Sequence, residues 1–378
     1  MVIINEPEEG LDINTIIATP SGWITIGGLK IGDIIFSDDG TLCNVIATSE
    51  IMNNHDCYEI EFSDGSKIIA DKNHLWETYT HDIRIKSKLY TVERRNQRRE
   101  KSRKENKEKN INFKEKEWLY REPLPIPKPI ILTTEKICES LYSKFKILNH
   151  AVKFIKPLNL ETKSLAIDPY VLGAWLGDGH SNGDGMTNDD FEILEHFIHV
   201  GYIVKKRKAK FSYGISKLRK ELRLNNLLKN KHIPEEYLRA SFDQRLSLLQ
   251  GLMDTDGTVR KGNGSCQFTT TSIKIRDGIL ELLRSIGVPA KYSEGNAKLY
   301  GRITSKKYNI DFLTEYPAFR LSRKLNIQKR ENFRFSYRFI KNVKKIESVP
   351  VRCIQVNSLS NMFLCGKEMI PTYNSMLI

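Results

Sequence analysis

Three features that would point to other kinds of protein are missing from this 378-residue sequence. Its six cysteines include no CxxC pair, which argues against a structural zinc site, and a chain of this length has little need of a disulfide framework. No apolar run approaches the ~20 residues of a membrane helix, and the amino terminus lacks the basic start and apolar core of a signal peptide. We therefore expect a cytoplasmic protein without a membrane partner.

Acidic residues are outnumbered by basic ones, and the net charge of +14 favours a polyanionic partner such as nucleic acid. Residues 84–116 are especially rich in lysine and arginine. Such a run is typical of a solvated helix or a disordered arm, and an arm that contacts DNA is a compatible alternative. A stiff connector is predicted after it by four alternate prolines, Pro123, Pro125, Pro127 and Pro129.

Hydrophobic patterns divide the rest of the chain into two kinds of structure. Residues 11–70 hold short β-rich segments separated by turn signals such as Pro20-Ser21-Gly22, and residues 337–372 return to the same β character. Between them, residues 165–335 alternate helical and strand-like patterns. We predict an all-β domain that is interrupted by a large α/β insert.

The insert contains two similar apolar helices that both end in Asp-Gly. The first ends at Asp178 and the second at Asp256, and similar sequence follows each, so we infer an internal two-fold repeat. Small residues would let the helices approach closely and bring the two carboxylates together, where they could hold a hard cation such as Mg²⁺ near a phosphodiester. Two core helices with capping Asp-Gly ends are the structural alternative.

These segments resemble the LAGLIDADG homing endonucleases, and residues 249–257 match the family pattern best. The first copy has Leu176 where the pattern has its first Asp, a position that is structural in the family. The resemblance implies that Asp178 and Asp256 are catalytic metal ligands for Mg²⁺. It also implies a pseudo-symmetric monomer that cuts double-stranded DNA at a long asymmetric site. An auxiliary basic residue is expected near the metal, with three candidates: Lys220, Lys306 and Lys324.

The two ends of the chain resemble inteins, which are self-splicing protein segments. The resemblance implies an all-β Hint-type splicing domain interrupted by an α/β (α+β) LAGLIDADG endonuclease domain with a pseudo-two-fold repeat. It also implies a prokaryotic or phage-encoded protein whose partners in cis are the flanking host segments, the exteins. The similar segments are residues 10–23, 64–76, 351–356 and 362–375. The implied division is an N-extein remnant (1–9), the splicing domain (10–83 and 336–374), a basic arm and connector that could contact DNA (84–164), the endonuclease (165–335) and a C-extein remnant (375–378).

Residues in these segments carry the chemistry that splicing needs. The Asn374 side-chain amide can attack its own backbone carbonyl and break the bond to Ser375, whose hydroxyl can accept an acyl group. A neutral His74 can polarise or protonate the first scissile amide. Gly10, however, stands where most inteins have Cys or Ser, and it carries no nucleophile. Either the protein cannot splice or another residue starts the reaction.

A minority group, the class 3 inteins, also lacks the first nucleophile, and this sequence resembles them at three positions. Cys353 matches the group's internal Cys. Trp76 matches its Trp two positions after the His that corresponds to His74, and Thr372 matches its Thr two positions before the terminal Asn. The resemblance implies that the Cys353 thiolate attacks the carbonyl of Glu9 and breaks the Glu9–Gly10 bond. The acyl group would then move to the Ser375 hydroxyl. Splicing would need no cofactor.

Two departures from the intein pattern concern the last cleavage. Tyr373 and Asn361 stand where most inteins have histidines that assist cyclisation of the terminal Asn. A tyrosine with a pKa of ~10 is a poor proton shuttle at neutral pH, so we expect slow C-terminal cleavage. Two alternatives stay open. One is a splicing-inactive intein that retains only DNA binding or cleavage, and the other is a DNA-binding module with degenerate nuclease sites.

Overall fold

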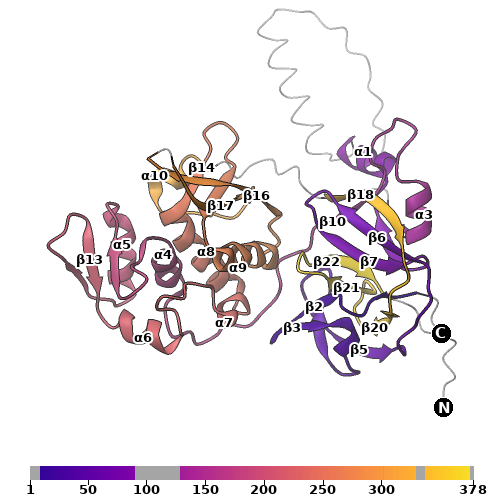
Figure 1. The fold of residues 1–378 in the computed structure, drawn as a ribbon, viewed down its shortest axis with the longest axis horizontal. Coiled ribbons are helices and arrows are strands. Elements are labelled where there is room, and N and C mark those ends of the chain that lie inside the picture. Colours follow the sequence, from indigo (N-terminus) through magenta and orange to yellow (C-terminus); the bar gives the residue numbers. More distant parts are fainter. Residues whose placement is uncertain (1–8, 90–127, 301, 329–336, 375–378) are drawn as a thin grey trace, which may run out of the picture.

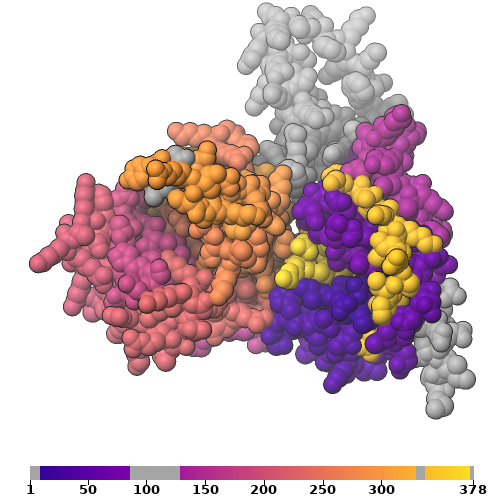
Figure 2. Space-filling view, in the orientation of Figure 1, coloured from indigo at the N-terminus to yellow at the C-terminus, as the bar shows by residue number. Residues whose placement is uncertain are grey.

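The computed structural model describes residues 9–89, 128–300, 302–328 and 337–374. Figure 1 shows two lobes side by side. We call the described residues of 9–153 and 337–374 the β-lobe, and those of 165–328 the α/β-lobe. Among the helices in the described part of the chain, none is long and apolar enough to span a lipid bilayer. Figure 2 shows the indigo and yellow ends of the sequence gathered in one lobe, so the intein-like segments meet in space.

The β-lobe mixes strands from both ends of the chain in every large sheet. A six-stranded sheet has the order β10-β18-β6-β7-β1-β19, a four-stranded one β22-β21-β2-β3, a three-stranded one β20-β5-β4, and β8 pairs with β9. The elements are β1 (Leu11–Asp12), β2 (Ile16–Thr19), β3 (Gly22–Thr25), η1 (Ile26–Gly28), β4 (Ile34–Phe36), β5 (Leu42–Thr48), β6 (Cys57–Phe62), β7 (Lys67–Asp71), β8 (Leu75–Thr78), α1 (His81–Leu89), β9 (Ile130–Thr133), α3 (Thr134–Glu139), β10 (Ala151–Lys153), β18 (Tyr337–Ile346), β19 (Val351–Arg352), β20 (Ile354–Val356), β21 (Met362–Cys365) and β22 (Ile370–Tyr373).

Alternation of side chains explains why these short strands form a core. In β6 the residues Ile60 and Phe62 are buried while the glutamates between and before them are only partly buried. Phe62 packs against the buried ring of Trp76, with ring centroids 6.1 Å apart. A period of two places every second residue on the inner face, so even strands of three to six residues bury apolar area.

Part of the predicted connector belongs to the β-lobe. β9 pairs with β8, α3 follows it, and β10 pairs with β18, although all three lie within residues 84–164. These elements are short and their partners are distant in sequence, so no local periodicity revealed them. The basic run that was predicted to be an arm lies mostly in residues 90–127, outside the described part of the chain.

The α/β-lobe repeats one arrangement twice. In each half a buried helix leads to short strands (one in the first half, two in the second), a second helix and a hairpin. β13 lies between β11 and β12 as β17 lies between β15 and β16. The elements are α4 (Pro169–Asp178), β11 (Gly185–Thr187), α5 (Phe191–His199), β12 (Val204–Lys206), β13 (Ser212–Ile215), α6 (Leu218–Leu224), α7 (Glu235–Leu238), α8 (Phe242–Asp256), β14 (Gly257–Val259), β15 (Cys266–Thr270), α9 (Ile273–Ser285), β16 (Ala290–Leu299), β17 (Arg302–Phe312) and α10 (Ser322–Leu325).

Helices α4 and α8 pack against each other through glycine. A Cβ added at Gly173 would lie 2.2 Å from the Leu248 carbonyl oxygen, and one added at Gly251 would lie 2.2 Å from the Tyr170 carbonyl oxygen. Side chains at these positions would therefore force the backbones apart. The close approach confirms the predicted two-fold repeat of helices and brings their C-terminal ends together.

A buried arginine joins the two lobes. Arg239, beside α7, donates to the carbonyl oxygen of Thr19 at 2.9 Å and to the Glu281 carboxylate at 2.6 Å. The same Glu281 oxygen accepts a hydrogen bond from the indole of Trp23, over whose ring the guanidinium stacks. Because Thr19 and Trp23 flank the β2–β3 turn, this network fixes that turn of the β-lobe to the α/β-lobe.

Candidate functional sites

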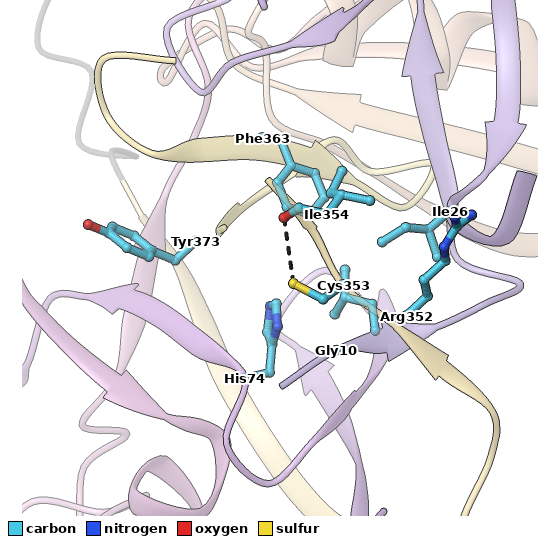
Figure 3. Close-up of a pocket in the computed structure, with 9 residues that line it drawn as sticks. Gly10, Ile26, His74, Arg352, Cys353, Ile354, Phe363 and Tyr373 are labelled. Atoms are coloured by element: carbon cyan, nitrogen blue, oxygen red, sulfur yellow. Dashed lines mark hydrogen bonds between the residues drawn. The ribbon is translucent and has the colours of Figure 1, made fainter. Parts of the chain in front are cut away.

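A small pocket in the β-lobe brings Gly10 and Cys353 together. Leu11 pairs with Arg352 and Asp12 with Val351 in an antiparallel ladder, so the next residues along it, Gly10 and Cys353, come opposite each other. Both line the pocket, together with the imidazole of His74 (Figure 3). A Cβ at Gly10 would lie 3.1 Å from backbone atoms of Arg352, so the bare glycine lets β1 lie this close to β19.

The Cys353 thiol is buried, with 4% of the residue exposed. Its sulfur lies 3.7 Å from the carbonyl oxygen of Ile354, a weak contact that Figure 3 marks, and it points into the pocket above the His74 ring. The backbone on both sides is fixed, because the Cys353 N–H donates to the Ser49 hydroxyl and its carbonyl accepts from the Ser49 N–H, each at 3.0 Å. The backbone that carries the thiol is therefore fixed beside residue 10.

His74 is held by the loop that follows β7. The buried carboxylate of Asp71 accepts hydrogen bonds from the backbone N–H groups of Asn73 at 3.0 Å and His74 at 2.9 Å, and it pairs with His55 at 3.1 Å. The Asp71 N–H in turn donates to the Gly10 carbonyl oxygen at 3.0 Å. Asp71 thus fixes His74 and residue 10 relative to each other. Sequence reasoning did not single it out, although an Asx-type loop at Asp71 was a readable signal.

Burial keeps the His74 imidazole neutral, because it lowers the pKa of the ring to about 3. Thr372 and Trp76 both contact this ring. The Thr372 hydroxyl lies 2.5 Å from His74 Nε2, and the Trp76 ring meets it edge-on with centroids 5.1 Å apart. The Trp76 N–H donates to Thr134, whose hydroxyl donates to the His74 carbonyl oxygen. Trp76 and Thr372 therefore restrain the His74 ring, and Trp76 also restrains the loop that carries it.

Asn374 lies at the end of β22, where its side chain is buried. Its side-chain amide donates to the Val356 carbonyl oxygen at 3.0 Å, and its backbone N–H donates to the carbonyl oxygen of Asn361 at 2.7 Å. Asn361 adopts a positive φ of 55° and contacts Asn374 through its backbone carbonyl. Figure 3 shows the Tyr373 ring directed away from the Cys353 sulfur. Ser375 lies outside the described residues.

A second candidate site lies at the C-terminal ends of α4 and α8. A Cβ at Gly177 would lie 3.4 Å from a carboxylate oxygen of Asp256, so this carboxylate is beside the residue that precedes Asp178. Burial raises the pKa of Asp256 to about 6, and the charge of Asp178 acts in the same direction. Burial also raises the pKa of Asp178. The two carboxylates are neighbours that repel one another, and Asp256 is also open to solvent, so a divalent cation could reach the pair and relieve the repulsion.

Comparison with known families bears on both sites. Residues 243–334 match the family model of the LAGLIDADG-like domain. The match covers the second acidic helix end, and the intein-like segments at both ends of the chain lie together in the β-lobe. The chain is an intein with a LAGLIDADG-like domain. The Hint-type fold predicted for the β-lobe and the α/β fold predicted for the insert are confirmed.

Curated relatives of this intein are replicative helicases. Over 375 residues it is 34% identical to the replicative DNA helicase DnaB of Mycobacterium intracellulare, and the alignment covers 98% of this chain and 59% of the relative. It is 40% identical over 81 residues to the replicative DNA helicase DnaB of Mycobacterium leprae, which covers 21% of this chain and 13% of the relative. The intein thus spans a little over half of the first relative's length.

Solved inteins also resemble this one, at low TM-scores. The crystal structure of the MchDnaB-1 intein is 13% identical, with a TM-score of 0.31 over 96% of this chain and 99% of that chain. The Msm DnaB1 intein splicing domain bound with zinc is 13% identical, with a TM-score of 0.30 over 96% and 99%. The gp41-1 intein is 30% identical over 18% of this chain and 53% of that chain, with a TM-score of 0.18.

Two lysines of the intein cap the acidic helices. Lys231 donates to three carbonyl oxygens at the end of α4, and Lys324 donates to four at the end of α8, at distances from 2.7 to 3.2 Å. Both charges act on Asp178 and Asp256. Burial lowers the pKa of Lys231 to about 8, against the pull of the two carboxylates, and it also lowers the pKa of Lys324. Lys324 was a candidate from sequence, whereas Lys231 was missed.

The other candidate lysines lie elsewhere. Lys220 is exposed on α6, and Lys306 pairs with Glu294 across the β16–β17 hairpin at 3.1 Å. The first aspartate of the pattern, Asp254, accepts hydrogen bonds from the Tyr170 hydroxyl at 2.7 Å and from the backbone N–H groups of Arg320 and Leu321. Such contacts support the structural role assigned to this position, where the first copy has Leu176.

Proposed function

We propose that this intein removes itself from a host protein by splicing that begins at Cys353, and that its α/β-lobe cuts double-stranded DNA with Mg²⁺. The splicing proposal rests on one observation above all, the pocket in which the Cys353 thiol, the His74 imidazole and Gly10 meet. The similarity along 98% of the chain to a DnaB protein supports a replicative helicase of that kind as the host.

In the first step the Cys353 sulfur attacks the Glu9 carbonyl carbon, and the Glu9–Gly10 bond breaks to give a thioester and a free Gly10 amine. The thiol proton must reach the departing Gly10 nitrogen. His74 suits this transfer because burial holds the ring neutral and its Nδ1 has no hydrogen-bond partner in the described part of the chain. Thr372 and Trp76 fix the plane of the ring, so they position the proton carrier.

Later steps exchange one acyl bond for another. The Ser375 hydroxyl attacks the thioester, forms an ester and returns its proton to the Cys353 thiolate. The Asn374 Nδ2 then attacks its own carbonyl carbon, closes a succinimide and transfers a proton to the departing Ser375 nitrogen. That amine attacks the ester, joins Glu9 to Ser375 by a peptide bond and restores the hydroxyl. No cofactor is required, because each step forms one acyl bond and breaks another.

A precursor with the chain between two folded reporter proteins tests the splicing proposal. We expect wild type to give ligated reporters and free intein, and Cys353→Ala to lose N-terminal cleavage. Cys43→Ala is the matched control, since Cys43 is also a buried thiol but lies on β5 outside the pocket. Cleavage that survives in Cys353→Ala would reject the internal nucleophile. A wild-type precursor that never cleaves would favour the splicing-inactive alternative.

The carboxylate pair fits a hard divalent cation. Asp178 and Asp256 supply anionic oxygens, and no cluster of three or more acidic, histidine or cysteine side chains suited to a metal occurs in the described part of the chain. The remaining oxygen ligands of Mg²⁺ would therefore come from water and DNA phosphate, as this ion prefers. Bound Mg²⁺ would favour ionisation of a water and stabilise the leaving oxygen. Lys231 and Lys324 place positive charge where a phosphate would enter.

Incubation with a plasmid that carries the intein-free host gene tests the nuclease proposal. We expect Mg²⁺-dependent linearisation at one site, abolished in Asp256→Asn while DNA binding persists. Asp277→Asn, at a half-exposed position on α9, is the control and should cut normally. We expect sedimentation of one monomer with one long asymmetric duplex. Binding without cutting by wild type would instead support a DNA-binding module with degenerate sites.

A further inference from the structure

The two halves of the α/β-lobe differ beside their carboxylates. In the first half Gly179 pairs with Met186, and in the second Gly257 pairs with Phe268. Two residues beyond these partners stand Asn188 and Thr270, which therefore occupy equivalent places next to Asp178 and Asp256. Each also lies two residues before the N-cap of the following helix, Asp190 for α5 and Ser272 for α9.

Asn188 is locked between the backbone and the carboxylate. Its side-chain oxygen accepts the Asp190 N–H at 2.7 Å, and because a backbone N–H can only donate, the amide nitrogen must face the other way. That nitrogen donates to Asp178 Oδ2 at 2.5 Å. The residue is 8% exposed, so little water competes for these bonds. One oxygen of Asp178 is thereby fixed, and the other accepts no hydrogen bond from the residues that the structure describes.

Thr270 makes only half of this arrangement. Its hydroxyl oxygen accepts the Ser272 N–H at 3.1 Å, which reproduces the bond from Asn188 to Asp190. The shorter side chain has no amide to extend toward Asp256, and the Asp256 carboxylate makes no hydrogen bond with any residue that the structure describes. The pseudo-two-fold symmetry is thus broken at one side chain, directly beside the carboxylate pair.

We propose that Asn188 is a positioning residue that orients Asp178 for a divalent cation, so that the Asp178 half of the site binds the cation more tightly than the Asp256 half. The inference rests on the proposed nuclease function. Partners that hydrogen-bond a ligating carboxylate typically change metal affinity 10–100-fold when they are removed. A DNA strand served by the Asp178 half would then be cut first, and a nicked duplex would accumulate before linear product.

Exchanging the two residues tests this proposal in the full chain. We would titrate Mn²⁺ alone and count the free ion by electron paramagnetic resonance, a readout that needs no cleavage. Wild type should show two affinities that differ by about tenfold or more. Asn188→Thr should weaken the tighter one about tenfold, while Thr270→Asn should strengthen the weaker one. Each variant places at one position the residue that its counterpart already tolerates, and thermal melts check folding. If Asn188→Thr does not fold, Thr270→Asn decides alone.

The outcomes separate this inference from the nuclease proposal. Equal affinities in wild type, no Mn²⁺ binding at all, or unequal affinities that neither exchange alters would overturn the role of Asn188. Unequal affinities that respond as expected, in a protein that cuts no DNA, would support the positioning role and reject the nuclease. On plasmid DNA, the wild-type protein should produce a nicked intermediate before the linear product. In Thr270→Asn this intermediate should persist for a shorter time.

Discussion

Replacing Gly173 with alanine should disable the nuclease through a single methyl group. The new Cβ would lie 2.2 Å from the Leu248 carbonyl oxygen and 2.9 Å from the Leu252 nitrogen, both backbone atoms that no rotamer change can move. Ordinary contact begins near 3.4 Å, so α4 and α8 would have to separate by about 1.2 Å along the shorter line. Overpacking of this kind costs about 1–3 kcal/mol, partly offset by the gain of about 1 kcal/mol in helix propensity.

The functional loss should exceed the loss of stability. Metal ligands must hold their distances within about 0.2 Å, and the separation acts on the two helices whose ends carry Asp178 and Asp256. We expect Gly173→Ala to lower the melting temperature of the α/β-lobe by several degrees and to abolish plasmid linearisation, with N-terminal cleavage by the β-lobe unchanged. Gly183→Ala is the control, since a Cβ there meets nothing within 4 Å. Unchanged melting and cutting in Gly173→Ala would refute the close-approach argument.

Three further predictions concern the β-lobe. Thr372→Val should slow N-terminal cleavage about tenfold in the reporter precursor, because it removes the hydrogen bond that fixes the His74 ring while keeping the shape of the side chain. Tyr373→His should speed C-terminal cleavage, and no acceleration in a time course would count against a missing proton shuttle. Burial raises the pKa of Asp71 from 3.8 to about 6, so the folded state binds the carboxyl proton of Asp71 more tightly than the unfolded state does. Protonated Asp71 therefore contributes fully to the stability of the folded state below about pH 4, and this contribution is lost as the pH rises through about 6. Thermal melts of Asp71→Asn should lack this loss of stability between about pH 4 and pH 6.

Local sequence pattern predicted the acidic helices well. The apolar runs around Gly173 and Gly251 and the Asp-Gly ends are properties of a few adjacent residues, and the structure bears them out as α4 and α8. The meeting of Gly10 with Cys353 could be expected only through resemblance, since the ladder that joins them pairs opposite ends of the chain. The catalytic roles of these residues stay predictions.

Contacts made by long or isolated side chains could not be predicted from the sequence. Lys231 stands in a loop with no periodicity, and its value comes from three carbonyl oxygens that only the folded α4 presents. Asp71 was missed for a similar reason, because its pairing with His55 and its link to Gly10 are tertiary. Asn188 and Thr270 occupy equivalent positions in the two halves of the α/β-lobe. The proposed role of Asn188 beside Asp178 can be recognised only once this equivalence is known from the structure.

The pairing of β10 with β18 bears on how such a protein could arise. Lys153 lies directly across from Tyr337 in the sheet. In the sequence, the whole α/β-lobe lies between these two residues. Two neighbouring strand ends can be closed by a turn of about two residues, so the ancestral or trimmed chain would need only a hairpin there. A nuclease gene could therefore have entered, and could be lost again, without disturbing the register of the sheet that surrounds the splice junction.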